Sequence, residues 1–264
     1  MELNRVKSIL NNDEKFDTDR ELVIKQIFEA GVTKVINAGY SLEASKFALK
    51  IAEKYDWMYT ISGISPNDIP DNEKSLGLEL SELVKFLEEN KNSKKIVAIG
   101  EIGLDYYWNT DNIELQKNAF IKQIEIANSM NLPIVIHTRD AVMDTLEILK
   151  KNQVVKHGVF HCCPLNRELV KEALKLGFYI SFAGPVTFKN SKNANEIIDM
   201  CPLDRMLIET DSPYLSPEPN RGKRNDSRNV KFIAEKIASV KGISVDEIAK
   251  ATYRNACKIF EINL

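Results

Sequence analysis

Several features are missing from this sequence, and each absence excludes a class of protein. No uninterrupted apolar run approaches the roughly 20 residues of a membrane-spanning helix. The segment 1–17 mixes charges throughout and has no apolar core of the kind found in secretion signals. The four cysteines fit neither a disulfide framework nor a zinc ribbon. We therefore expect a soluble, cytoplasmic protein with reduced thiols and no membrane partner.

The sequence also lacks an excess of positive charge. The formal net charge is −2, which excludes a global basic field of the kind that marks many nucleic-acid-binding proteins. A nucleic-acid substrate would have to be held by a local patch. Histidine is scarce as well, with 3 in 264 residues and none before residue 137. Each histidine at the end of an apolar run is therefore informative about a site.

Short apolar runs alternate with longer segments of helical period, and most of the runs are continuous, as in parallel strands buried on both faces. The expected strands lie within 32–39, 57–64, 95–104, 132–138, 158–163, 178–184 and 204–211, and clear helical segments are 19–31, 41–55, 114–130 and 167–177. Gly31 and Gly177 stand where helices should stop. Seven strand–helix pairs are one short of a closed barrel. We predict an α/β fold, a (β/α)8 TIM barrel, as a single domain over 1–264, with the missing strand in Leu3–Leu10.

Ionisable residues follow the expected strands at the end where parallel barrels carry their sites. They are Glu101, Asp105, His137, His161, Glu209 and Asp211. A buried imidazole costs desolvation unless it has a partner. One glutamate and two histidines on neighbouring strands favour a mixed nitrogen and oxygen site for Zn, Mn or a similar cation.

Simpler interpretations exist for each of these residues. A lone histidine at a strand end is more often a satisfied core residue than a ligand. Asp211, in the string TDSP, is equally typical of a residue that caps a turn. Glu209 is interpreted as a structural partner within the barrel. The segment RGKRN (221–225) is either a solvated loop or a phosphate site, because phosphate sites often follow the last strand of a barrel.

Six segments together resemble the TatD-related deoxyribonuclease family, in the family's order and spacing. They are GEIGLDYYW (100–108), PIVIHTRDA (133–141), FHC (160–162), GPVTFKN (184–190), IETDSPYL (208–215) and RGKRN (221–225). The resemblance implies an amidohydrolase-like barrel and a metal-dependent phosphodiesterase, typically a DNase and often a 3′-to-5′ exonuclease on single strands or 3′ ends. It implies that Glu101, His137, His161 and Asp211 are metal ligands.

The chain departs from the family pattern at the N-terminal His-x-His pair. The pair should fall around Val6 to Asn11, where the sequence reads VKSILN. A second departure is GISPND (63–68), which has Ser65 and Asn67 in the two histidine positions of the family's GxHPH. The losses concern one metal of the two, whereas Glu101, His137 and His161 would hold the other.

The resemblance thus implies a reduced site with one or two divalent cations, Mg, Mn or Zn. Glu101 and Asp211 are the expected catalytic residues, with Asp211 released from coordination to act as general base. The expected phosphate-binding residues are Ser65, Arg139, Arg221, Lys223 and Arg224.

Three functions remain open at this point. The first is a metal-dependent phosphodiesterase acting on DNA, with impaired activity. The second is a catalytically impaired relative that binds nucleic acid or a protein partner, which the missing histidines favour. The third is a hydrolase of another small ester or amide. The intact half of the metal site places the first ahead.

Overall fold

The computed structural model describes residues 14–263, and seven parallel strands form one curled sheet in the order β1 to β7. The strands are β1 Val35–Gly39, β2 Met58–Ser62, β3 Ile96–Asp105, β4 Ile134–Arg139, β5 Gly158–Phe160, β6 Tyr179–Phe182 and β7 Met206–Ile208. Every run that we expected to be a strand contains one. The strand expected in Leu3–Leu10 lies outside the described residues.

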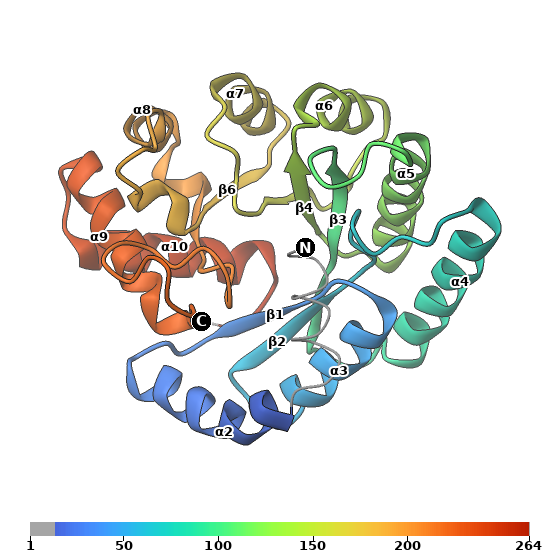
Figure 1. Cartoon of the computed structure of the whole chain (residues 1–264), viewed down its shortest axis with the longest axis horizontal. Coiled ribbons are helices and arrows are strands. Elements are labelled where there is room, and N and C mark those ends of the chain that lie inside the picture. Colours follow the sequence, from blue (N-terminus) through green and yellow to red (C-terminus); the bar gives the residue numbers. More distant parts are fainter. Residues whose placement is uncertain (1–13, 264) are drawn as a thin grey trace.

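Helices follow the strands and surround the sheet (Figure 1). They are α2 Glu14–Glu29, α3 Leu42–Ala52, α4 Glu73–Glu89, α5 Ile113–Met130, α6 Val142–Lys151, α7 Arg167–Lys175, α8 Ala194–Met200, α9 Val230–Lys241 and α10 Val245–Ile259. Gly31 and Gly177 follow α2 and α7 with φ angles of 86° and 85°, which confirms them as helix stops. No helix in the described part of the chain is long and apolar enough to cross a membrane.

Side chains along each strand alternate between the surrounding helices and the interior of the barrel. The outward residues, such as Ile136 and Phe160, pack with α3 to α9 in one large cluster. The inward residues Val135, Val159 and Leu207 pack instead against α10. They lie in the N-terminal half of the barrel. The C-terminal helix therefore closes the end of the barrel opposite the strand ends that carry the candidate site.

Two buried glutamines on α5 fix the backbone of two loops beside the site. The side-chain oxygen of Gln123 accepts the Ile64 N–H at 2.8 Å, and its nitrogen donates to the Ile64 C=O at 2.9 Å. The side-chain oxygen of Gln116 accepts the Asp105 N–H at 2.8 Å, and its nitrogen donates to the Asp105 C=O at 3.1 Å. Each glutamine thus satisfies both the backbone N–H and the backbone C=O of one residue. Helix α5 holds the loop after β2 and the end of β3 in place.

The Gln123→Leu variant is expected to lose about 2–4 kcal/mol of unfolding free energy, because it leaves the buried N–H and C=O of Ile64 without partners. Chemical denaturation with urea measures the loss. The matched control is Glu125→Leu, at an exposed position of the same helix, which should change stability by less than about 0.5 kcal/mol. Equal stability of the two variants would show that the loop does not depend on this pairing.

Candidate metal centre

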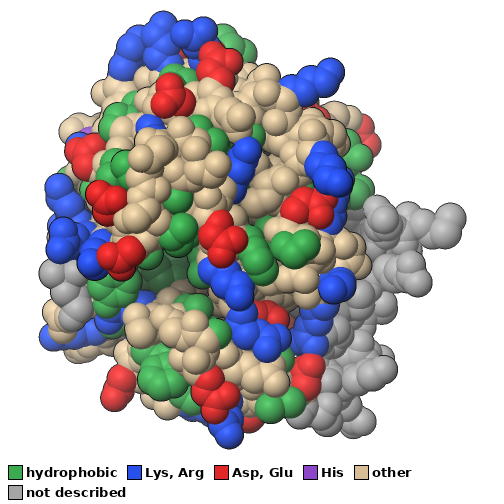
Figure 2. Space-filling view, turned by 90° about the vertical axis from the view of Figure 1, so that its left-hand side faces the viewer, with side chains coloured by type: hydrophobic (Ala, Val, Ile, Leu, Met, Phe, Trp, Pro, Cys, Tyr) green, Lys and Arg blue, Asp and Glu red, His purple; other side chains and the backbone are tan. Residues whose placement is uncertain are grey.

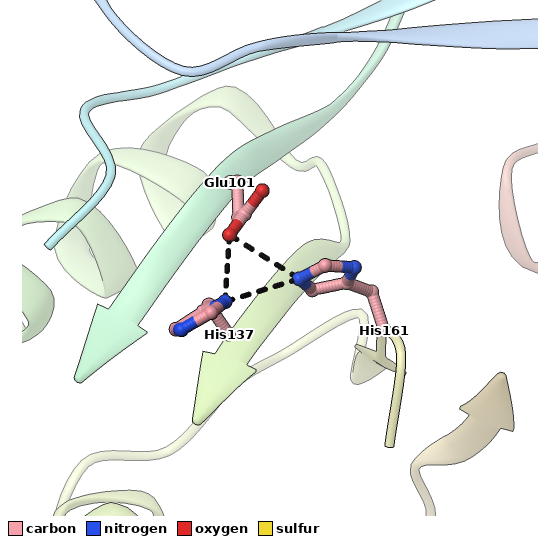
Figure 3. Close-up of side chains that lie close together, drawn as sticks. All are labelled: Glu101, His137 and His161. Atoms are coloured by element: carbon pink, nitrogen blue, oxygen red, sulfur yellow. Dashed lines mark hydrogen bonds and ion pairs between the residues drawn. The ribbon is translucent and has the colours of Figure 1, made fainter. Parts of the chain in front are cut away.

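Three side chains from consecutive strands meet at one point inside the C-terminal end of the barrel (Figure 3). Glu101 comes from β3, His137 from β4, and His161 directly follows β5. Oε1 of Glu101 lies 2.8 Å from Nδ1 of His137 and 3.2 Å from Nε2 of His161. The two ring nitrogens are 3.3 Å apart. The sequence placed these residues on one edge of the sheet, and the structure brings them together.

Strand alternation explains why the two histidines face each other. His137 lies two residues after the inward-facing Val135, and His161 lies two residues after the inward-facing Val159. A step of two residues keeps a side chain on the same face of a strand. Both imidazoles therefore point into the barrel, in the layer above the apolar residues that α10 covers.

Glu101 reaches the same layer through an irregularity in β3. The register of β3 against β4 shifts between Ile99 and Ile102, which places a β-bulge at Gly100 and Glu101. Gly103 then takes a φ of 137° and passes so close to β4 that a Cβ atom would lie 2.0 Å from the His137 carbonyl oxygen. Only glycine fits both requirements. The glycine of the GEIGLD string thus serves the approach of β3 to the strand that carries His137.

In each histidine, the ring nitrogen that points away from Glu101, the outer nitrogen, faces a second carboxylate. Nε2 of His137 lies 3.0 Å from Oδ2 of the buried Asp105, and Nδ1 of His161 lies 3.7 Å from Oε1 of Glu209. Glu209 also accepts the backbone N–H of Cys162. Carboxylates in this position orient metal-binding imidazoles and raise their basicity. Our interpretation of Glu209 as a partner within the barrel did not identify His161 as the residue it faces.

Strand alternation could have located Glu209 from the sequence. It lies two residues after Leu207, which faces inward with the other residues packed on α10. Asp105 carried a weaker signal, since its position at a strand end indicated a polar site but not which atom it would contact.

The electrostatics of the group favour a positive charge at its centre. Burial alone would lower the pKa of His137, but Asp105 and Glu101 outweigh burial and raise the pKa to about 9. The pKa of His161 is also raised well above its usual value, since Glu101 and Glu209 outweigh burial. In turn, the two imidazoles overcome burial and hold the pKa of Glu101 well below its usual range.

The donor set fits a divalent metal ion. The ligand atoms of Glu101, His137 and His161 all lie within 4.8 Å of one another. Two nitrogen lone pairs and a carboxylate oxygen repel one another at this distance unless a cation or a proton lies between them. With a hydrogen on the outer nitrogen of each ring, facing Asp105 or Glu209, both inner nitrogens are free to bind metal. Mixed imidazole and carboxylate ligands suit Zn and Mn.

Asp211 lies near this group but outside it. Its ligand atoms are not among the three that gather. Burial raises the pKa of its carboxyl to about 6, against the opposing effect of the His161 imidazole. The following turn forms through the backbone, with the Tyr214 N–H donating to the Asp211 C=O at 2.9 Å. No described side chain or backbone group in the range 19–263 donates a hydrogen bond to its side chain, so side-chain capping of the turn has no support there.

The loop after β2 carries Ser65 and Asn67, the two residues that the resemblance places at histidine positions of the family. The buried Ser65 donates from Oγ to Asp68 at 2.7 Å. Asn67 donates from Nδ2 to Asp105 Oδ2 at 3.1 Å, the same oxygen that faces His137. Asn67 therefore helps to hold the carboxylate that orients His137, a role that the sequence did not indicate.

The candidate phosphate-binding cations are exposed and come from two regions. Arg139 ends β4, with its guanidinium carbon 3.6 Å from the centre of the Tyr107 ring. Arg221 lies over the ring of Phe188 at 4.2 Å, and Arg224 pairs with Asp19 at 2.6 Å. Lys and Arg side chains are interspersed with Asp and Glu on the face seen in Figure 2. Side chains of both charges are mixed on that face, in agreement with the formal net charge of −2.

Comparisons with known proteins extend over nearly the whole chain. A family model described as TatD related DNase matches residues 10–261. A Bacillus subtilis (strain 168) protein with the name "Uncharacterized metal-dependent hydrolase YabD" is 41% identical over 253 residues, which is 96% of each chain. A protein of Escherichia coli (strain K12), "Uncharacterized metal-dependent hydrolase YcfH", is 46% identical over 169 residues, 64% of each chain.

A solved structure agrees with these sequence matches. YJJV, a TatD homologue from Escherichia coli K12, superposes with a TM-score of 0.87 at 26% identity and covers 95% of both chains. The family match over residues 10–261 spans Glu101, His137 and His161, and the fold class predicted from the sequence is confirmed.

The Asp105→Asn variant is expected to bind Zn about tenfold more weakly than the wild type, because a neutral amide holds and polarises the His137 ring less strongly. Competition with a chromogenic chelator measures the affinity. Asp111→Asn, an exposed position in the loop after β3, is the matched control and should bind Zn like the wild type. Unchanged affinity in Asp105→Asn would argue against His137 as a ligand.

Proposed function

The chain belongs to the TatD-related DNase family, whose relatives bear the name metal-dependent hydrolase, and on this premise we propose that it is a phosphodiesterase that acts on DNA. The proposed reaction is removal of nucleotides from single strands, in the 3′-to-5′ direction. The observation that carries the proposal is the convergence of Glu101, His137 and His161 on one point at the mouth of the barrel.

The proposed ligands of one divalent cation are Glu101, His137 and His161. A cation bound there would supply Lewis-acid chemistry, which lowers the pKa of water and polarises a phosphoryl oxygen. Glu101, His137 and His161 are the three side chains that would hold it. Asp105 and Glu209 support the geometry by fixing the two imidazole rings.

Asp211 is the proposed general base. Its carboxylate is close enough to Glu101 and His161 for its pKa to respond to both, yet it receives no hydrogen bond from any described residue. A carboxylate in that state is available to take the proton of the attacking water. Its raised pKa also agrees with a group that exchanges a proton near neutral pH.

The DNA backbone would be held by cations at the mouth of the barrel. Arg139 follows the strand that carries His137, and Arg221, Lys223 and Arg224 lie in the segment after β7. Guanidinium groups pair with phosphates through two parallel hydrogen bonds, and lysine acts as a point charge. Ser65 is the remaining proposed contact, weaker than the histidine that the family has there.

A second candidate function is binding without turnover, which the absence of any histidine before residue 137 favours. The missing residues would hold a second cation in the family, and two cations together stabilise the attacking and leaving oxygens. With one cation the reaction is expected to be slower. Ser65 and Asn67 moreover bond to Asp68 and Asp105 within the protein.

The proposal predicts that purified protein releases nucleotides from 3′-labelled single-stranded DNA when Mg, Mn or Zn is supplied, and that EDTA stops release. Glu101→Ala should abolish release, because it removes the proposed metal ligand that lies in contact with both His137 and His161. The matched control is Glu89→Ala, an exposed glutamate at the end of α4, which should retain full activity. If wild type and Glu101→Ala are equally inactive while folded, the binding function replaces the enzymatic one.

A separate variant distinguishes a base from a ligand at position 211. Asp211→Asn should lower the rate of nucleotide release by about 10²- to 10⁴-fold, the usual contribution of a general base. Its affinity for the cation, from titration calorimetry, should match that of the wild type. A loss of cation affinity comparable with that of His161→Ala would instead identify Asp211 as a ligand.

A further inference from the structure

Two large aromatic side chains lie exposed directly beside the candidate metal centre. Tyr107 and Trp108 follow β3 and keep 55% and 44% of their surface exposed. Their rings meet edge to face at 4.8 Å between centroids. The other tryptophan, Trp57, packs against Phe28 and Tyr55 in another part of the molecule. Aromatic surface of this size is usually covered by a partner or used to bind one.

A cation completes the aromatic pair. The guanidinium carbon of Arg139 lies 3.6 Å from the centre of the Tyr107 ring and 5.4 Å from that of Trp108. Among the described side chains of residues 19–263, no carboxylate pairs with Arg139. No described carboxylate therefore neutralises its charge, and stacking on the two rings fixes its position. We call Tyr107, Trp108 and Arg139 the aromatic platform.

One buried carboxylate joins this platform to a candidate ligand. Oδ1 of Asp105 accepts the backbone N–H groups of Tyr107 at 3.0 Å and Trp108 at 3.2 Å. Its other oxygen, Oδ2, faces Nε2 of His137 at 3.0 Å. Arg139 lies two residues after His137 on β4, on the same face of that strand. The platform therefore has a fixed position relative to the metal centre.

We propose that the aromatic platform stacks a nucleobase of single-stranded DNA next to the candidate metal centre, while Arg139 binds a neighbouring phosphate. The inference rests on the proposed function and adds the way the strand is recognised. Aromatic faces stack any base, so recognition would not depend on sequence. In a duplex the base faces are covered by neighbouring pairs, so the platform selects single strands or unpaired ends.

The first test uses Trp108 as its own reporter. Because the chain has 2 tryptophans, Trp57→Phe leaves Trp108 as the sole source of tryptophan fluorescence. The probe is oligothymidylate of about eight nucleotides, within the range of single-strand site sizes, added in EDTA to prevent cleavage. An abasic oligomer of equal length and charge is the comparison. Stacking predicts quenching by the thymidylate and not by the abasic oligomer; no difference between them overturns the proposal.

The second test measures affinity by fluorescence anisotropy with the same two oligomers carrying a label. The double variant Tyr107→Leu/Trp108→Leu keeps apolar bulk but removes the rings. It should bind thymidylate roughly tenfold or more weakly than the wild type, with unchanged affinity for the abasic oligomer. Phe28→Leu, at an aromatic position that is 54% exposed beside Trp57, is the matched control and should bind both oligomers like the wild type. An equal loss for both oligomers overturns stacking.

Nucleotide release from the wild type, measured beside Glu101→Ala, separates failure of this inference from failure of the proposed function. Metal-dependent release without any preference for bases over the abasic oligomer would overturn the platform and leave the phosphodiesterase in place. Base-dependent quenching and binding without release would support the platform as part of a protein that binds single strands without cutting them.

Discussion

One oxygen of Glu101 lies within hydrogen-bond distance of both His137 and His161, and the rest of the site is arranged around that shared contact. A partly buried carboxylate and two partly buried imidazoles carry a desolvation cost unless their charges and lone pairs are balanced. The balance extends outward, because Asp105 and Glu209 face the far side of each ring. Five ionisable groups thus compensate one another at the C-terminal end of the barrel.

The barrel makes this arrangement possible by sorting its interior into layers. The layer next to α10 contains apolar side chains such as Val135 and Val159, and the layer above it contains the two histidines. Packing in the lower layer fixes the strands, so the polar layer does not have to stabilise the fold. A bulge in β3, between Ile99 and Ile102, interrupts the regular alternation of that strand at Glu101.

The sequence predicted the strands well because continuous apolar runs leave few alternatives, and it predicted the convergence of Glu101, His137 and His161 because parallel strands end on one side. The pairings of Gln116 and Gln123 were not predictable, since a glutamine in an amphipathic helix looks like any surface residue. The stacking of Arg139 on Tyr107 depends on a loop path and a side-chain rotamer that no pattern encodes. The strand predicted in Leu3–Leu10 stays a prediction.

The two glutamines of α5 hold a main-chain N–H and C=O, which every amino acid except proline supplies. Gln123 keeps the path of the GISPND loop whatever side chains the loop carries, and Gln116 does the same where β3 ends. Substitutions in these loops can therefore change the chemistry at the mouth without altering where the chain runs. The loop therefore lies against α5 with Ser65 and Asn67 at the two positions where the resemblance expects histidines. The contacts from α5 to the backbone fix the shape of these loops, whereas the side chains of the loops determine the chemistry at the mouth of the barrel.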